Sequence, residues 1–141
     1  FVIFQEEALK ELGEFMAETY KKSVSEDDFF QRKYDKFLTR PTLSSVVIAI
    51  CMKRQQTERI PEIEEIAAVA CSVQNIHLTA TAYGLGGYWS SGNIAYSQEM
   101  KSYLNLGEKD RCLGLFYIGY PDIDWPRGQR KTLEHKTEWR K

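Results

Sequence analysis

The stretch from Ile66 to Gln98 contains no aspartate, glutamate, lysine or arginine. The whole chain of 141 residues is 28% charged, so these 33 positions (98 − 66 + 1) should hold roughly nine charges. The first half, Ile66 to Tyr83, is rich in small residues and is typical of a helix. The second half, Gly84 to Gly92, is expected to be a glycine-punctuated loop with two large aromatics, Tyr88 and Trp89. A buried helix leading into an uncharged loop predicts a site for a planar ligand.

The length and charge of the chain limit the classes of protein to which it can belong. At 141 residues with 43% hydrophobic content, the sequence predicts one globular domain over residues 1–141. A net charge of −1 gives no general reason to expect nucleic acid or a membrane surface as a partner. Polar residues such as Gln74, Asn75 and His77 interrupt the uncharged stretch, which excludes it as a membrane span.

Three cysteines, Cys51, Cys71 and Cys112, lie far apart, each within an apolar segment. Their odd number and spacing predict buried free thiols in a reducing compartment, and no cysteine or histidine spacing suggests a metal site. The start of the chain shows no signal-peptide pattern, so we expect a cytoplasmic protein. It opens on Phe1-Val-Ile-Phe4 without an initiator methionine, and we expect it to be a fragment or a processed product.

Hydrophobic periodicity and capping signals predict alternating strands and helices. A pair formed by Ser25 and Asp28 resembles a capping box and is expected to begin a helix that Pro41 closes. Gly84 is the expected C-cap of the long helix that follows Pro61. In order, we expect a strand at 1–4, helices at 6–22 and 25–40, a strand at 43–52, helices at 61–83 and 97–106, and a strand at 112–118.

The helix that follows Pro61 is apolar almost all round from Ile66 onward. Such a helix is expected to be buried on every side. Its alanines and serine allow another helix to approach closely. In so short a chain, a second subunit is one way to cover it.

Several enzyme classes do not fit the sequence. Ser90 and Ser91 lack the flanking glycines of a nucleophile elbow, and the chain contains neither a Walker loop nor an HExxH motif. His77 is more simply a hydrogen-bonded core histidine than a catalytic base. Gly84-Leu-Gly-Gly87 follows a helix, whereas a dinucleotide fingerprint must follow a strand. Taken alone, this glycine segment is a helix cap and turn.

The continuation of that segment, Tyr88-Trp-Ser-Ser-Gly92, suits a flavin. Glycines allow the backbone to approach a flat ring, and hydroxyl or backbone groups can bond the pyrimidine edge. The phosphate then needs arginine or lysine from elsewhere. The basic tail, in which Arg127 to Lys141 holds six basic and two acidic residues, offers Arg130 and Lys131. These features permit a flavin without singling it out.

Segments along the whole chain, in their order and spacing, resemble the FMN-dependent nitroreductase-like oxidoreductases. Phe1-Val-Ile3 looks like a strand of the family, and Leu113 to Pro121 looks like its last core strand. The other matching segments are Ile60-Pro-Glu62 with Ala68-Val-Ala70 and Val73-Gln-Asn75, Tyr83 to Gly92, Arg130 to Glu134, and Trp139.

The resemblance implies an α+β fold, a mostly antiparallel sheet flanked by helices, in an interlocked homodimer with FMN at the interface. Trp89, Ser90, Ser91 and Gly92 are then expected to line the flavin ring, and Arg130 to meet its phosphate. The implied activity is hydride transfer from NADH or NADPH through FMN to nitroaromatics, quinones or related small-molecule acceptors. Because the cofactor supplies that chemistry, no catalytic side chain is expected.

Two features depart from the family pattern. Ser90 stands where relatives often carry a basic residue, so a less cationic site is expected. The family's Arg-Arg-Ser and Asn-Gln-Pro-Trp motifs would lie before Phe1, and their absence favours an alternative. The alternative is a flavin-free dimerisation or binding module that keeps the fold without redox activity. Retention of Trp89 to Gly92 together with Arg130 favours the enzyme.

Overall fold

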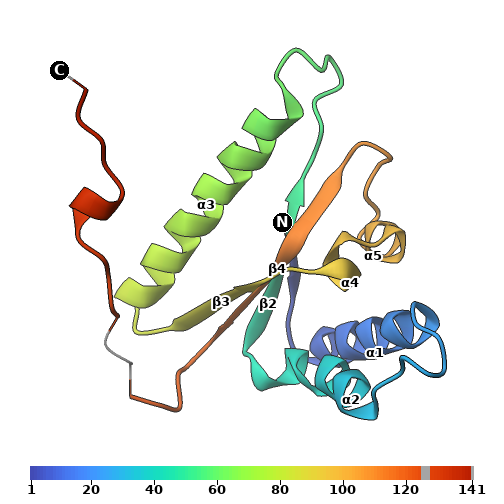
Figure 1. Cartoon of the computed structure of the whole chain (residues 1–141). Coiled ribbons are helices and arrows are strands. Elements are labelled where there is room, and N and C mark those ends of the chain that lie inside the picture. Colours follow the sequence, from blue (N-terminus) through green and yellow to red (C-terminus); the bar gives the residue numbers. More distant parts are fainter. Residues whose placement is uncertain (125–127, 141) are drawn as a thin grey trace.

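A four-stranded sheet with helices on both faces forms the body of the molecule (Figure 1). The structure is a computed structural model and describes residues 1–124 and 128–140. The strand order is β1-β2-β4-β3, and each neighbouring pair is antiparallel. The elements are β1 (Val2–Phe4), α1 (Glu7–Lys22), α2 (Gln31–Thr39), η1 (Pro41–Leu43), β2 (Val46–Met52), α3 (Glu62–Ala82), β3 (Gly86–Ser90), α4 (Asn93–Tyr96), α5 (Gln98–Tyr103), β4 (Arg111–Gly119) and η2 (Leu133–His135).

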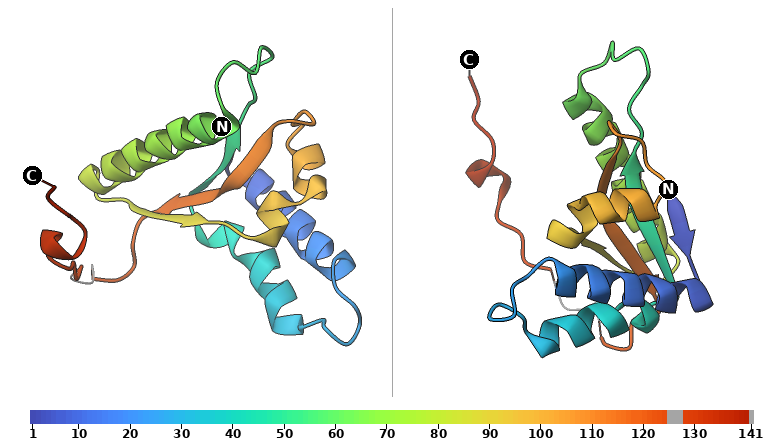
Figure 2. Two further views of the ribbon diagram at one scale, coloured as in Figure 1. Left: turned by 45° about the horizontal axis from the view of Figure 1, so that its top comes forward. Right: turned by 90° about the vertical axis from the view of Figure 1, so that its right-hand side faces the viewer.

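Two hydrophobic clusters fill the space between the sheet and its helices. On one face, Leu12 and Met16 of α1 pack with sheet residues such as Val47. On the other face, Val73 of α3 packs with Ile50 and Phe116. Figure 2 shows α1 and α2 on the side of the sheet opposite α3. The predicted α+β architecture with an antiparallel sheet is therefore confirmed.

The second helix begins later than its capping signal predicts. The Ser25 hydroxyl accepts a bond from the Asp28 N–H at 3.3 Å, which closes only a local turn. Phe30 is then extended, with φ −114° and ψ 112°, and its N–H donates to the Tyr20 hydroxyl at 3.0 Å. Because that bond ties the chain to α1 in an extended form, α2 starts at Gln31 and not at Ser25.

The glycine-rich segment after α3 is largely a strand, not the predicted loop. Gly86–Ser90 pairs with β4 along its whole length and forms an edge of the sheet. This strand lies close to the side chains of Phe116 and His77 because residue 87 is a glycine. A Cβ at Gly87 would lie 2.7 Å from the Phe116 ring and 3.1 Å from His77. Small residues thus let this strand lie beneath α3.

The helix predicted at 97–106 is the shorter α5 (Gln98–Tyr103), and a separate short helix that was not predicted, α4 (Asn93–Tyr96), comes just before it. Ser97 separates them because it is extended, and its hydroxyl accepts a bond from the Met100 N–H at 3.1 Å as the N-cap of α5. The backbone therefore turns at Ser97 before the last helix begins.

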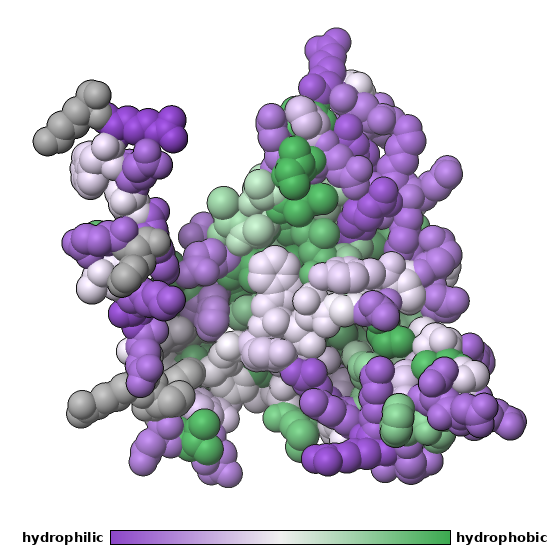
Figure 3. All heavy atoms as spheres, in the orientation of Figure 1, coloured by the Kyte–Doolittle hydropathy of each residue, from purple (hydrophilic) through white to green (hydrophobic). Residues whose placement is uncertain are grey.

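Helix α3 is less buried within one chain than its composition predicts. Val73 and Ala80 are its buried residues, while Ile63 and Leu78 on its outer side are 69% and 60% exposed. Figure 3 shows hydrophobic side chains along α3 on the face turned toward the viewer. Within the described residues, no helix is both long and apolar enough to cross a bilayer. The expected burial on every side is thus not reached in a single chain.

The end of α3 follows the sequence prediction. Gly84 has φ +74°, which suits glycine, and the Leu85 N–H donates to the Ala80 carbonyl at 2.9 Å.

The prediction of buried free thiols holds for part of the three cysteines. Cys112 is buried and Cys51 is half-buried, but Cys71 is exposed because it lies on the outer side of α3.

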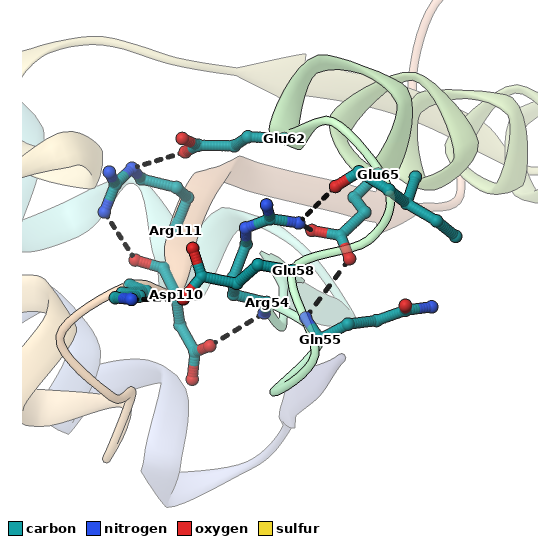
Figure 4. A network of polar contacts seen from close by, with 9 residues as sticks. Arg54, Gln55, Glu58, Glu62, Glu65, Asp110 and Arg111 are labelled. Atoms are coloured by element: carbon teal, nitrogen blue, oxygen red, sulfur yellow. Dashed lines mark hydrogen bonds and ion pairs between the residues drawn. The ribbon is translucent and has the colours of Figure 1, made fainter.

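A largely buried ion pair fastens the β2–α3 loop to the body (Figure 4). Arg54 Nη1 lies 2.6 Å from Glu65 Oε2, and Gln55 donates its N–H to the same carboxylate at 3.1 Å. Asp110 accepts the backbone N–H groups of Arg54 and Gly107, each at 2.9 Å. Burial raises the pKa of the Asp110 carboxyl, but these bonds favour the charged form and hold its pKa below the ordinary value. The loop is thereby held to both α3 and the start of β4.

Candidate functional site

A cavity of about 410 Å³ lies between α1, α2 and the turn from β3 to α4. Its polar lining includes hydroxyl groups from Thr19 and Ser23 and the cationic side chains of Lys33 and Arg40, with Glu99 as the acidic member. The volume falls in the range of small-molecule sites. Two cations against one carboxylate favour a ligand with polar or anionic groups.

Three of the five residues predicted from the sequence line this cavity. Ser90, Ser91 and Gly92 follow one another at the end of β3 and the start of α4. Ser90 is opposite Leu115 in the sheet, which also lines the cavity. The strand and its turn therefore present two hydroxyls and a glycine backbone to the same space.

Trp89 lies on the face of β3 opposite to that of Ser90. Successive residues of a strand point to opposite faces, and Trp89 is not among the residues that line the cavity. Its indole Nε1–H donates to the Leu113 carbonyl at 3.2 Å, across the edge of β4. The contact seen for Trp89 is thus one that fastens β3 to β4.

Arg130 is also outside the cavity in this chain. It belongs to the tail at 128–140, which leaves the body and runs on the side of α3 (Figures 1 and 2). The Arg130 side chain is exposed. Two other basic residues of the tail, Arg127 and Lys141, lie outside the described residues. Within one chain, Arg130 and the Ser90–Gly92 segment are therefore not brought together.

Arg40, which the sequence analysis did not select, lies at the cavity. It follows α2 directly, and its Nη1–H donates to the Ser90 hydroxyl at 3.3 Å. The guanidinium carbon is 4.8 Å from the centre of the Tyr88 ring and 4.9 Å from that of Tyr117. Arginine over aromatic faces is stabilised by cation–π attraction. A cation therefore reaches Ser90 from α2, although position 90 itself carries none.

Tyr117 lies beneath Arg40 in the sheet and is 5% exposed. Its hydroxyl has no hydrogen-bond partner in the part of the chain that the structure describes. Burial raises the pKa of the Tyr117 phenol, while the charge of Arg40 opposes that rise. Tyr117 is thus a neutral aromatic support for the arginine.

The sequence contains no local signal that joins Arg40 to Ser90, because 50 positions separate them. A basic residue before Pro41 at the end of a predicted helix is an ordinary pattern. The arrangement depends on β3 pairing with β4, which places Tyr88 opposite Tyr117. Together, the guanidinium, two hydroxyls and a glycine backbone can bind the polar edge of a flat ligand.

Comparison with known families and curated proteins gives consistent matches. The model of the nitroreductase family matches residues 1–120. YdjA of Escherichia coli (strain K12), provisionally named an NAD(P)H nitroreductase, is 27% identical over 89 residues, which are 63% of this chain and 49% of YdjA. YfhC of Bacillus subtilis (strain 168), provisionally named in the same way, is 28% identical over 110 residues, covering 77% of this chain and 55% of YfhC. The chain thus spans about half the length of these relatives.

Solved structures share the fold. A nitroreductase-like family protein from Bacillus cereus superposes with a TM-score of 0.75 at 26% identity, covering 97% of this chain and 70% of that one. The FMN-dependent nitroreductase NfnB from Mycobacterium smegmatis, solved in complex with NADPH, gives a TM-score of 0.69 at 13% identity, covering 99% of this chain and 78% of that one. At 13% identity, the similarity to the second structure shows only that the two proteins share a fold.

Proposed function

The chain belongs to the nitroreductase family, and from that premise we propose that the native polypeptide carrying these 141 residues is an FMN-dependent NAD(P)H oxidoreductase. Its acceptors in this proposal are small molecules such as nitroaromatics or quinones. The observation that carries the proposal is the meeting of Arg40 with Ser90, Ser91 and Gly92 at one cavity. The cytoplasmic location expected from the free cysteines stays a prediction.

The residues present fit one edge of a flavin. Arg40 is held by two aromatic rings, so little side-chain freedom is lost when its remaining N–H groups bind a carbonyl. The hydroxyls of Ser90 and Ser91 add donors and acceptors beside it. When bound, FMN supplies the acceptance and donation of hydride. The protein side chains would then bind and orient the ring, and Arg40 would hold a fixed positive charge beside it.

Arg130 and Trp89 keep the roles that the resemblance implies, as proposals. Arg130 is the proposed phosphate contact, and Trp89 a proposed border of the ring. The exposed, extended tail leaves the Arg130 guanidinium free to meet an anion. Trp89 supports the site in a second way, because its bond to Leu113 fixes the strand that carries Ser90.

Substitution of either arginine is expected to weaken FMN binding. Arg40→Met removes the cation but keeps an apolar side chain between the tyrosines, and Arg130→Ala removes the proposed phosphate contact. Each loss of a charged hydrogen bond should cost about 1.5 to 3 kcal/mol of binding free energy. Equilibrium titration with FMN measures the change. Arg32→Met, at an exposed position of α2, is the matched control and should bind like the wild type. An unchanged affinity in either test variant removes that residue from the site.

We also propose a homodimer in which α3 is covered by a second copy of the chain. The helix has no charge from Ile66 to its end, yet most of its outer surface is exposed. An open groove of about 400 Å³, lined by residues such as Ile76, Tyr83 and Leu85, continues this apolar surface. Leu78→Glu should therefore lower the sedimenting mass from dimer to monomer, whereas Glu18→Lys, at an exposed position of α1 on the other face of the sheet, should not. A monomeric wild type contradicts the proposal.

The alternative function is a flavin-free binding module of the same fold. Oxidation of NADH and NADPH by the native polypeptide, with and without added FMN and a quinone acceptor, separates the two functions. The oxidoreductase predicts turnover that requires FMN and falls in the Arg40→Met variant. Absence of FMN-dependent turnover with either nucleotide favours the binding module.

A further inference from the structure

Two cysteines on neighbouring strands face each other directly. In the pairing of β2 with β4, Cys51 is the register partner of Cys112. Opposed residues of an antiparallel pair have Cα atoms about 4.5 or 5.5 Å apart, within the range of about 4.4 to 6.8 Å that a disulfide spans. Both side chains lie on the α1 side of the sheet, Cys112 within the cluster there and Cys51 packed against it. The two thiols are therefore neighbours on one face.

A bulge in the sheet creates this pairing. Ile50 faces Gly114, so a regular ladder would place Cys51 opposite Leu113. The register shifts between Ile50 and Cys51, and Cys112 becomes the partner instead. Bulges re-aim side chains at specific positions of a sheet. The alignment of the cysteines is thus a feature of this irregularity and not of regular strand pairing.

The two thiols have different environments. Cys51 is half-buried, and Cys112 is 4% exposed. The neighbouring Cys112 thiol lowers the pKa of the Cys51 thiol, although burial opposes this. The same contact, together with burial, raises the pKa of the Cys112 thiol. Cys51 is therefore the more accessible sulfur and the better nucleophile of the pair.

We infer that Cys51 and Cys112 form a dithiol site that a hydroperoxide closes into a cross-strand disulfide. The Cys51 sulfur attacks the peroxide, the O–O bond breaks, an alcohol leaves, and Cys51 becomes a sulfenic acid. The Cys112 sulfur then attacks the Cys51 sulfur, the S–S bond forms, the S–O bond breaks, and water leaves with the Cys112 proton. The two thiols lose two electrons in total, and these reduce the hydroperoxide to alcohol and water.

The dithiol lies next to the segment that supports the candidate cavity. The Cys112 Sγ is 3.8 Å from the Gly114 carbonyl, to which it donates. Gly114 in turn packs against the Trp89 side chain and the Ser90 backbone. A disulfide at this point ties β2 to β4 near Gly114, the residue that lies against β3. The inference itself does not depend on flavin binding.

Peptide mapping of the native polypeptide tests the site. The reduced protein, freed of reductant, is treated with tert-butyl hydroperoxide, alkylated with iodoacetamide, digested without reductant and analysed by mass spectrometry. We expect a peptide pair joined through Cys51 and Cys112, with Cys71 alkylated, and release of the pair by dithiothreitol. Recovery of Cys51 and Cys112 both alkylated, both over-oxidised, or joined only to Cys71 overturns the inference.

Two further cysteine variants, both of which keep the buried Cys112, extend the test. Cys71→Ser removes the exposed thiol on α3 and should leave the cross-link at its wild-type yield. Cys51→Ser should abolish it and leave Cys112 alkylatable after denaturation. Loss of the cross-link in Cys71→Ser overturns the inference. Because the readout is a covalent bond, it can succeed or fail whether or not the protein binds FMN.

Discussion

Replacing Gly114 with alanine is expected to lower the free energy of unfolding by about 2 to 6 kcal/mol. Gly114 has φ +136°, a conformation that costs a side-chain-bearing residue about 1 to 3 kcal/mol. A Cβ there would also lie 2.5 Å from both the Ser90 carbonyl oxygen and Trp89 Nε1. Relieving that overlap adds about 1 to 3 kcal/mol, because the carbonyl belongs to the backbone of the paired strand β3.

Urea denaturation followed by circular dichroism measures this loss, and Gly128→Ala is its control. A Cβ at Gly128 meets nothing within 4 Å, so that variant should change the stability by less than about 0.5 kcal/mol. Since β3 carries Ser90, Gly114→Ala should also weaken FMN binding. If Gly114→Ala is as stable as the wild type, the described close contact of Gly114 with β3 is wrong.

Glu65→Gln is expected to destabilise the fold by about 3 to 5 kcal/mol, because it leaves Arg54 charged and largely buried without its partner. The side chains of Arg54 and Glu65 are 11% and 9% exposed, so water compensates little. Arg54 Nη1 also donates to the Ile60 carbonyl at 2.7 Å, which ties the loop before α3 to the same cation. Loss of the carboxylate therefore loosens the loop as well as the helix start.

Matched variants separate this pair from general charge effects. Glu64→Gln removes a neighbouring exposed carboxylate from the first turn of α3, which should cost about 0.3 to 1 kcal/mol through the helix dipole. The double variant Arg54→Met with Glu65→Leu should recover much of the stability, since an apolar pair can replace a buried ion pair. Equal effects of Glu64→Gln and Glu65→Gln in thermal and urea unfolding contradict the account.

Elements defined by local patterns were predictable from the sequence. The apolar run before Met52, the Pro61 start of α3 and the Gly84 cap each depend on neighbouring residues, and the structure confirms them. Within the site, Ser90, Ser91 and Gly92 were found together because they are consecutive.

Features that depend on distant pairing were not predictable. The Ser25 signal forms a turn, because the Tyr20 hydroxyl holds Phe30 extended. The glycine-rich segment becomes a strand because β4 offers it a free edge and Phe116 leaves room for Gly87. Arg40 reaches Ser90 only through the Tyr88–Tyr117 pairing. In each case the deciding partner is at least ten positions away, beyond the reach of periodicity or capping rules.

The proposed flavin site has Arg40 and the Ser90–Gly92 segment along one edge. It can be tested by a fluorescence titration of the native polypeptide with FMN, run beside Arg40→Met and Arg32→Met. We expect saturable binding of one FMN per chain in the wild type and in Arg32→Met, with affinity in Arg40→Met reduced about 10- to 100-fold. Unchanged flavin fluorescence with wild-type protein, or equal affinity in all three proteins, contradicts it.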